Sequence, residues 1–291
     1  MGQISANIID QNAHCDRMKE LLQFRSTHPT KRQSIDGVEW NYILAGTGTE
    51  TVLVLSGMLG RVDTGYRMVM NLEKTYRVLS ISYPLYDEIG ALVDGLIKLL
   101  DREGIQRIHL VATSLGTAVG HVLVRRYPDR FDRMVLSTFG LYDDRKLKQV
   151  KQFIDLLDRL PYWAIKKYFK LVFPYSLKGF DESDKQFQIA YLNDLLDIQS
   201  DKQTMMSQYR MLLEMFENPT YGIDRPIDKS SILIMQSQDD ESWDRNAQAV
   251  FRQTYPNAHI QLFAEGGHFR EIRDENKHIE TVRHFLELES A

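Results

Sequence analysis

The residue pattern with the clearest chemical potential in this chain centres on Ser114, in the stretch RIHLVATSLGTAVGH at 107–121. Ser114 follows a short apolar run and precedes a helical segment, with Ala112 two places before it and Gly116 two places after it. A serine on such a sharp strand-to-helix turn projects its hydroxyl from the carboxyl edge of a parallel sheet. The pattern predicts Ser114 as a nucleophile, with Ala112 as a small substitute for the first glycine of Gly-x-Ser-x-Gly. Taken alone, the small residues are equally typical of a buried turn.

A serine nucleophile needs a base to take its proton and a carboxylate to orient that base, and two later segments offer them. His268, in AEGGHF, follows an apolar run through a Gly-Gly turn, which predicts an imidazole at the same sheet edge as Ser114. Acidic residues follow another apolar run in SILIMQSQDDESW. We expect Asp239 to orient His268, because it comes where the chain first turns over the edge; Asp240 is the alternative.

Other residues fit these two roles less well. Asp143 and Asp144 follow an earlier apolar run and are a less favoured position for the acid. Four further histidines fall inside an expected strand or on expected helices, where core packing or a solvated face explains them: His109, His121, His278 and His284.

The segment SGMLG, which follows the apolar run TVLVLS, is a candidate for an oxyanion hole. Gly57 and Gly60 let the backbone approach a substrate closely, so the N–H of Met58 is one expected donor. The N–H of Leu115 is the second, because it lies at the N-terminus of the helix after Ser114 and gains from the helix dipole. Without the other motifs, SGMLG would be an ordinary glycine-containing turn.

Six short apolar runs are the elements that must position these residues. Such runs are typical of strands buried on both faces, and they fall at 51–56, 77–82, 107–112, 133–138, 231–236 and 259–263. Between the first four lie segments of helical period, such as YDEIGALVDGLIKLLDREG, while GVEWNYILAGTGTE alternates like a more exposed strand. We therefore expect an α/β fold with a mostly parallel central sheet flanked by helices.

The alternation of strands and helices stops between 141 and 229, where only helical patterns occur. We expect a core domain of 1–140 and 230–291 and a helical cap of 141–229. The cap contains PYWAIKKYFKLVFPY, whose aromatic residues would roof an apolar pocket or pack the cap onto the core. We expect Gly57 and Trp163 to contact substrate, and the interleaved lysines to form a solvated face.

The composition excludes several classes of function. A net charge of -4 in 291 residues suggests neither nucleic acid nor anionic membrane as the main partner. Cys15 is the only cysteine, so an intramolecular disulfide and a cysteine zinc site are excluded, which fits a cytoplasmic protein. The apolar stretch 108–124 contains histidine and hydroxyl side chains and divides into a strand and a helix, so we expect no transmembrane segment. No dinucleotide, Walker or His-Glu-x-x-His motif occurs, so no cofactor or metal is expected.

Roughly residues 36–288 resemble the α/β-hydrolase fold superfamily, in which serine, acid and histidine follow in that chain order. Within it, FRSTHPTKR, IHLVATSLGT and YPNAHIQLFAEGGHF resemble the maspardin branch. That branch implies a nucleophile elbow but also an alternative, a non-catalytic protein that binds a partner. Ala112 and Ser56 depart from the superfamily pattern, Ser56 because many members have histidine there.

These features together predict a serine hydrolase that cleaves a carboxylic ester or thioester through an acyl-enzyme intermediate. Its site would comprise Ser114, His268 and Asp239, with the amides of Met58 and Leu115 as the oxyanion hole. The same residues would also serve an acyltransferase or a lyase, so those reactions stay open.

Overall fold

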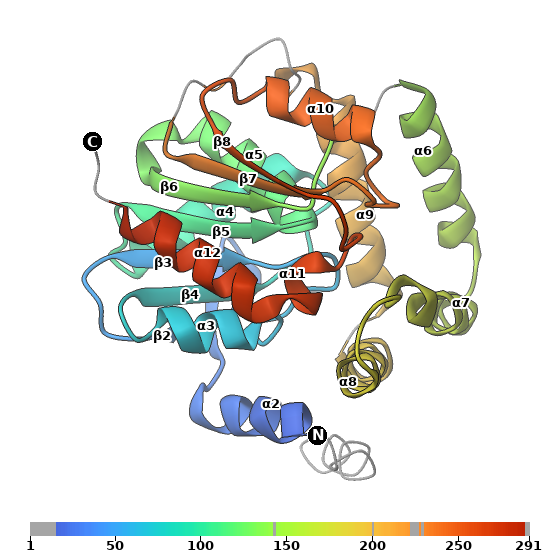
Figure 1. Ribbon diagram of the computed structural model, residues 1–291, viewed down its shortest axis with the longest axis horizontal. Helices are drawn as coiled ribbons and strands as arrows, with labels where there is room; N and C mark the ends of the chain where they lie inside the picture. The colour runs from blue at the N-terminus through green and yellow to red at the C-terminus, as the bar shows by residue number, and fades with distance from the viewer. Residues whose placement is uncertain (1–15, 142–143, 200, 222–226, 228–229, 289–291) are drawn as a thin grey trace.

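The computed structural model describes residues 16–141, 144–199, 201–221, 227 and 230–288, so Cys15 and Asp143 lie outside it. Within these residues eight strands form one sheet (Figure 1). The strands are β1 (Lys31–Ile35), β2 (Val38–Ala45), β3 (Thr51–Leu55), β4 (Arg77–Ser82), β5 (Ile108–Thr113), β6 (Phe131–Ser137), β7 (Ile232–Ser237) and β8 (His259–Phe263).

The strand order in the sheet is β1-β2-β4-β3-β5-β6-β7-β8. The pairs β1–β2 and β2–β4 are antiparallel, and the pairs from β4–β3 onward to β7–β8 are parallel. The six apolar runs of the sequence correspond to β3 through β8, so the predicted mostly parallel sheet is confirmed. All parallel strands end at the same edge, where α/β sheets place their ligands.

Helices cover both faces of this sheet, as Figure 1 shows. The helices and short helical turns are α2 (Asp16–Thr27), α3 (Tyr66–Leu72), α4 (Ile89–Arg102), α5 (Leu115–Arg126), η1 (Pro128–Arg130), α6 (Asp144–Arg159), α7 (Tyr162–Ser176), α8 (Glu182–Asp194), η2 (Leu195–Gln199), α9 (Lys202–Glu217), η3 (Pro219–Tyr221), α10 (Arg245–Gln253), α11 (Arg270–Arg273) and α12 (Glu275–Glu287).

The two faces of the sheet bury different helices because side chains alternate along each strand. On β3, Val52 and Val54 pack with α2, α3 and α12, whereas Leu53 and Leu55 pack with α4, α5 and α10. The sheet is thereby enclosed on both sides, which explains why its strands are apolar throughout.

The four helices α6 to α9 come between β6 and β7 in the sequence and lie beyond the carboxyl ends of the strands (Figure 1). They share a small apolar cluster of their own that includes Ile154 and Leu157 of α6, Ile165 of α7 and Met205 of α9. Farther along α9, Met211 and Met215 join the main core. These helices therefore stand over the sheet edge at which Ser114 lies.

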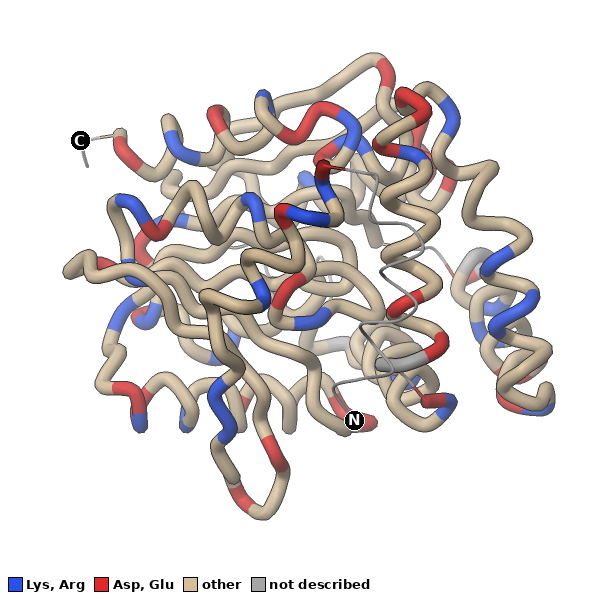
Figure 2. The backbone as a smooth tube through the Cα atoms, turned by 90° about the horizontal axis from the view of Figure 1, so that it is seen from below, with Lys and Arg blue, Asp and Glu red and all other residues tan. Residues whose placement is uncertain are grey.

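Charged residues of both signs are interspersed along the chain in the view from below (Figure 2). On α7, Lys166 and Lys170 both bind the carboxylate of Asp197, at 3.2 and 2.6 Å. These two lysines are thus part of a solvated face with ion pairs. Separately, no helix in the described ranges has the length and apolar character needed to cross a membrane.

Candidate active site

Ser114 lies on a strained turn between β5 and α5. Its backbone has φ 50° and ψ -116°, a conformation that costs a non-glycine residue about 1–3 kcal/mol. The turn packs against β3 so closely that a Cβ atom on Gly116 would come within 2.2 Å of the Leu55 carbonyl oxygen. The Ser114 N–H donates to the carbonyl of Ser137 on β6 at 3.1 Å, which holds the strained residue in place. The glycine two places after the serine is therefore a steric requirement.

Ala112, two places before the serine, is also closely packed. It is 2% exposed, and a Cβ atom on Gly120 of α5 would lie 3.8 Å from its methyl group. Its carbonyl accepts a hydrogen bond of 3.1 Å from the Thr117 hydroxyl. A residue with a single methyl group therefore fits where the hydrolase pattern has glycine.

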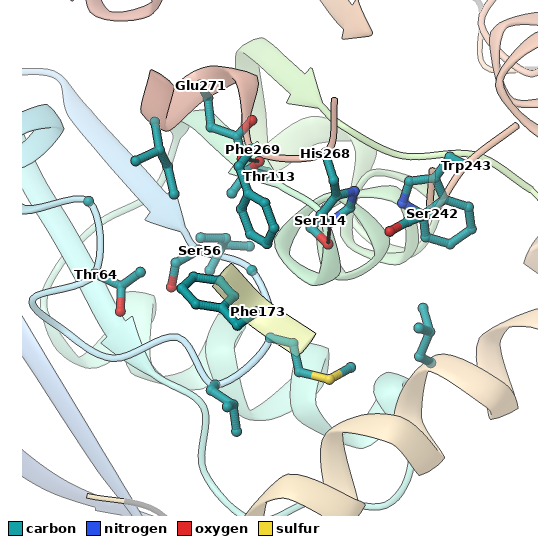
Figure 3. A pocket seen from close by; sticks show the side chains of 18 of the residues that line it. Ser56, Thr64, Thr113, Ser114, Phe173, Ser242, Trp243, His268, Phe269 and Glu271 are labelled. Carbon is teal, nitrogen blue, oxygen red and sulfur yellow. Dashed lines mark hydrogen bonds between the residues drawn. The ribbon is translucent and has the colours of Figure 1, made fainter. Parts of the chain in front are cut away.

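His268 reaches Ser114 from the loop that follows β8. Ser114 Oγ lies 3.2 Å from His268 Nε2, the contact drawn in Figure 3. The loop turns through Gly266 at φ 139° and Gly267 at φ 62°, conformations in the region that favours glycine. The Gly-Gly turn of the sequence thus brings the imidazole to the serine.

The carboxylate beside His268 belongs to Asp240, which corrects the expectation of Asp239. His268 Nδ1 lies 3.2 Å from each carboxylate oxygen of Asp240. The same carboxylate accepts backbone N–H bonds from Ser242 at 2.8 Å and Trp243 at 3.1 Å, and its side chain is 1% exposed. Asp240 is thereby held in one orientation toward the imidazole.

Asp239 instead supports the loop that carries the histidine. Its exposed carboxylate accepts the backbone N–H groups of Gly266 at 3.1 Å and Gly267 at 2.9 Å. Burial would raise the pKa of Asp239, but these two hydrogen bonds outweigh it and lower the pKa. Asp144, which the sequence offered as a less favoured position for the acid, is an exposed residue of α6.

The electrostatics of His268 suit a base that is stabilised when it gains a proton. Burial alone would lower the pKa of His268, but the hydrogen bond and negative charge of Asp240 outweigh burial. The negative charge of Glu271 acts in the same direction, and the pKa is raised above 6.5. An imidazolium at this position is therefore favoured by its carboxylate neighbours.

The SGMLG segment forms a tight turn above the serine. The Gly60 N–H donates to the Gly57 carbonyl at 3.0 Å, and Leu59 has a positive φ of 61°. Gly57 lies against Ser114, since a Cβ atom there would be 3.4 Å from the serine Cβ. Met58 lines the cavity at Ser114, and its N–H is not used by the hydrogen bond that closes this turn. Leu115 is the first residue of α5, so its N–H has no acceptor within that helix.

A cavity of about 680 Å³ opens at Ser114 and His268. Gly57 and Met58 line it, but Trp163, which was expected to contact substrate together with Gly57, is not among the lining residues and is 67% exposed. Two other aromatic residues of α7, Phe169 and Phe173, face the cavity in its place. The remaining lining from the inserted helices is mostly apolar: Val150, Phe153, Met205, Tyr209 and Leu212.

Glu271 is a site residue that the sequence motifs did not reveal. Its two carboxylate oxygens accept hydrogen bonds from the hydroxyls of Thr113, at 2.8 Å, and Thr138, at 3.0 Å. It therefore connects the short helix after His268 to the ends of β5 and β6. The available signal was its spacing of three residues after His268, which places both on one side of a helical turn.

Two further histidines have the structural roles that their positions suggested. His109 is buried on β5, and His121 is buried on α5 between the Tyr255 hydroxyl at 2.6 Å and the Tyr221 carbonyl at 2.9 Å. Burial, with a smaller effect of Arg125, lowers the pKa of His121 to about 3. Both imidazoles pack in the core away from Ser114.

Comparison with known proteins agrees with this architecture. The profile of the alpha/beta hydrolase fold matches residues 50–270. Maspardin of Danio rerio is 24% identical over 256 residues, which cover 84% of this chain and 78% of that protein. A hydrolase from Pseudomonas aeruginosa superposes with a TM-score of 0.72 at 14% identity, covering 89% of this chain and 98% of its own. The enol-lactonase from Burkholderia xenovorans superposes with a TM-score of 0.70 at 16% identity, covering 88% of this chain and 99% of the lactonase chain. By its profile match and its sheet order, this chain belongs to the α/β-hydrolase fold family, and its sequence is similar to maspardin.

Proposed function

We propose that this protein is a serine hydrolase that cleaves a carboxylic ester or thioester without a cofactor. The observation that carries the proposal is the run of contacts from Ser114 on its strained turn through His268 to Asp240, at the mouth of a cavity. In serine hydrolases these three residue types act as nucleophile, general base and orienting acid. A turn with this much backbone strain is typical of functional positions.

The reaction begins when Ser114 Oγ attacks the carbonyl carbon of the substrate and its proton passes to His268 Nε2. The carbonyl oxygen becomes an oxyanion that the N–H groups of Met58 and Leu115 stabilise, each such donor contributing about 3 kcal/mol in related sites. The carbon–oxygen or carbon–sulfur bond then breaks, and His268 protonates the departing alcohol or thiol. An acyl group stays on Ser114.

Water completes the cycle by attacking the acyl-enzyme. As the water oxygen bonds to the acyl carbon, His268 takes a proton from the water. The bond between the acyl carbon and Ser114 Oγ then breaks, and His268 returns the proton to Oγ. The carboxylic acid leaves. Throughout these steps Asp240 keeps the imidazole aligned and stabilises its protonated form.

The helices α6 to α9 form the cap in this proposal. Their apolar side chains, Phe169 and Phe173 among them, provide most of the cavity wall opposite the sheet edge. The ring of Phe173 meets that of Phe269, the neighbour of His268, edge to face at a centroid distance of 5.5 Å. This wall favours an apolar group of the substrate, because burial of apolar surface contributes about 25 cal/mol per Å².

Replacement of the nucleophile tests the proposal directly. We expect Ser114→Ala to reduce hydrolysis of p-nitrophenyl butyrate by at least about a thousandfold, because loss of the nucleophile removes the covalent route. Wild-type protein should react with a fluorophosphonate probe, and His268→Ala should lose most of that labelling. A folded wild-type protein that neither turns over short esters nor labels would overturn the proposal.

A non-catalytic binding function is the second candidate, and exposed apolar residues on α7 favour it. Trp163, Leu171 and Tyr175 are each more than 60% exposed on this helix. An exposed apolar patch on a protein surface often marks a site of interaction with another molecule. The fluorophosphonate experiment separates the two candidates, because a binding protein needs no activated serine.

A further inference from the structure

The cavity extends past Ser114 onto the face of the sheet that α3 and α12 cover. Val54 and Val111 of that face line it, together with Met68 of α3 and Ile279 of α12. We call this part of the cavity the inner chamber. Its lining residues are Val54, Met68, Val111, Ile272, His278 and Ile279.

Thr113 shares a face of β5 with Val111 of the inner chamber, and it donates a hydrogen bond to Glu271. In Figure 3 Thr113 and Glu271 lie on one side of Ser114, and Ser242 and Trp243 lie on the other. The Glu271 carboxylate receives hydrogen bonds from two neutral hydroxyls. Within the described ranges no Lys or Arg nitrogen lies within 4.0 Å of it to form an ion pair, and the charge of Arg270 acts on it only from beyond that distance. A carboxylate in this setting is incompletely compensated, and it faces a cavity.

The rest of the cavity wall adds no positive charge. Among the described lining residues the charged types are Glu241, Glu271 and Glu275, and none is Lys or Arg. Glu275 is already paired, with Arg17 at 2.6 Å and Arg67 at 3.3 Å. The cavity therefore presents a net negative wall, and Glu271 is the acidic group of the inner chamber that has no cationic partner of its own.

His278, at the inner end of the chamber, does not offset this charge. It is buried, and its Nδ1 atom has no hydrogen-bond partner among the described residues. Burial, with a smaller effect of Arg270, lowers the pKa of His278 to about 4, so the imidazole is neutral at pH 7. The chamber thus combines apolar walls, a neutral imidazole and one carboxylate that has no ion pair within 4.0 Å.

We propose that the inner chamber is a subsite for an ammonium group of the substrate, recognised by Glu271; this inference rests on the proposed ester hydrolysis. An ammonium group would form an ion pair with the Glu271 carboxylate. The apolar walls would accept the carbon chain that carries the ammonium group. A substrate carboxylate or phosphate in the same place meets only like charge. The enzyme would then prefer cationic over neutral esters, and neutral over anionic ones.

The test compares esters that differ in charge at one end. In the acyl series, p-nitrophenyl 6-aminohexanoate, heptanoate and hydrogen adipate carry an ammonium, a methyl and a carboxylate group. In the alcohol series, butyrylcholine is compared with its uncharged counterpart, 3,3-dimethylbutyl butyrate. We expect kcat/KM for the cationic ester of at least one series to exceed that of the neutral one by about tenfold or more.

Glu271→Gln should bring that ratio close to one, because it removes the charge and keeps the shape. The amide oxygen can accept from one threonine hydroxyl, and the amide NH2 can donate to the other. The ratio is taken within one variant, so any effect of the substitution on His268 cancels. Glu241→Gln is the matched control: it removes a carboxylate next to Ser242, on the other side of Ser114, and should keep the wild-type ratio. An equal ratio in wild type and Glu271→Gln for both series would overturn the inference.

Failure of the proposed function would be visible separately, as absent turnover of the neutral esters and absent fluorophosphonate labelling. In that case the subsite can still be tested by calorimetry, which measures the binding of hexylammonium and of 1-hexanol to the wild type and to Glu271→Gln. Preference for the ammonium in the wild type alone supports the subsite. Equal binding of the two compounds, or binding of neither, overturns it.

Discussion

At the scale of single residues, the site depends on which of two adjacent carboxylates faces the histidine. The chain leaves β7 at Ser237 and turns at once, with the Asp240 N–H donating to the Ser237 carbonyl at 3.3 Å. This turn directs Asp240 inward to His268 and leaves Asp239 to hold the Gly266 and Gly267 amides. One carboxylate contacts the imidazole, and the other holds the loop that carries it.

Asp240→Asn should therefore damage the reaction more than Asp239→Asn. We expect kcat/KM for p-nitrophenyl butyrate to fall by about a hundred- to ten-thousandfold in Asp240→Asn, as in other sites that lose the orienting acid. Asp239→Asn removes a similar charge and should cost about tenfold or less, through a looser loop. A larger loss in Asp239→Asn would contradict the assignment of Asp240.

The pH profile gives an independent measure of the same contact. His268 must be unprotonated to accept the serine proton, so wild-type kcat/KM should rise with pH through a pKa above 6.5. In Asp240→Asn the carboxylate that raises this pKa is gone, so the rise in the residual activity should move to lower pH. An unmoved profile, measured with a neutral ester between pH 5 and pH 9, would show that Asp240 does not set the pKa of the base.

At the scale of elements, a hydrogen bond joins α9 to the turn of residues 57–60, which carries the proposed Met58 donor. The Leu59 N–H donates to the Gln208 side-chain oxygen at 2.7 Å, and Gln208 is a buried residue of α9. The turn of residues 57–60 is thus held from above by a helix that lies between β6 and β7 in the sequence. The position of the proposed Met58 donor therefore depends on the contact between Leu59 and Gln208.

Gln208→Ala is expected to affect both catalysis and stability. The partly buried Leu59 N–H would lose its acceptor, which costs up to about 1–3 kcal/mol of unfolding free energy. We expect kcat to fall by about tenfold with a smaller change in KM, because the turn would act mainly in the transition state. Ser207→Ala is the control, since this neighbour bonds the Tyr86 carbonyl instead and should leave kcat close to wild type. Equal effects of the two variants on kcat would contradict the role of Gln208.

At the scale of the whole molecule, a buried ion-pair cluster joins three distant segments. Arg25 of α2 contacts Asp63, in the loop after β3, at 2.6 Å and Asp194, at the end of α8, at 2.8 Å. The two aspartate side chains are 3% and 5% exposed. One guanidinium therefore connects α2, the loop after β3 and the end of α8.

Arg25→Ala should destabilise the protein because it leaves two buried carboxylates without the cation that they share. Removal of one partner from a buried pair typically costs about 3–5 kcal/mol, and denaturant unfolding measures this loss. Arg67→Ala removes a more exposed arginine that contacts Glu20 and Glu275, and should cost less. A smaller loss for Arg25→Ala than for Arg67→Ala would show that the cluster does not couple these segments.

The sequence by itself determined the parallel sheet and the residues that meet at its edge. Apolar runs reveal buried strands because both faces of the sheet are covered, and the small residues around Ser114 and the glycines before His268 reflect local steric demands. These patterns depend on residues that are close in the sequence, so they can be recognised without knowledge of the tertiary structure. Ser114 and His268, 154 positions apart, were placed together for that reason.

Only the tertiary structure decided which nearby side chains turn toward the site. Asp240 replaces Asp239 because of one turn after β7, and Phe169 and Phe173 replace Trp163 because of how α7 docks over the sheet edge. The contacts of Glu271 with Thr113 and Thr138 arise where three separate segments converge. Composition and periodicity are almost the same whichever of two neighbouring side chains points toward the site. Packing between distant parts of the chain therefore decides which one does.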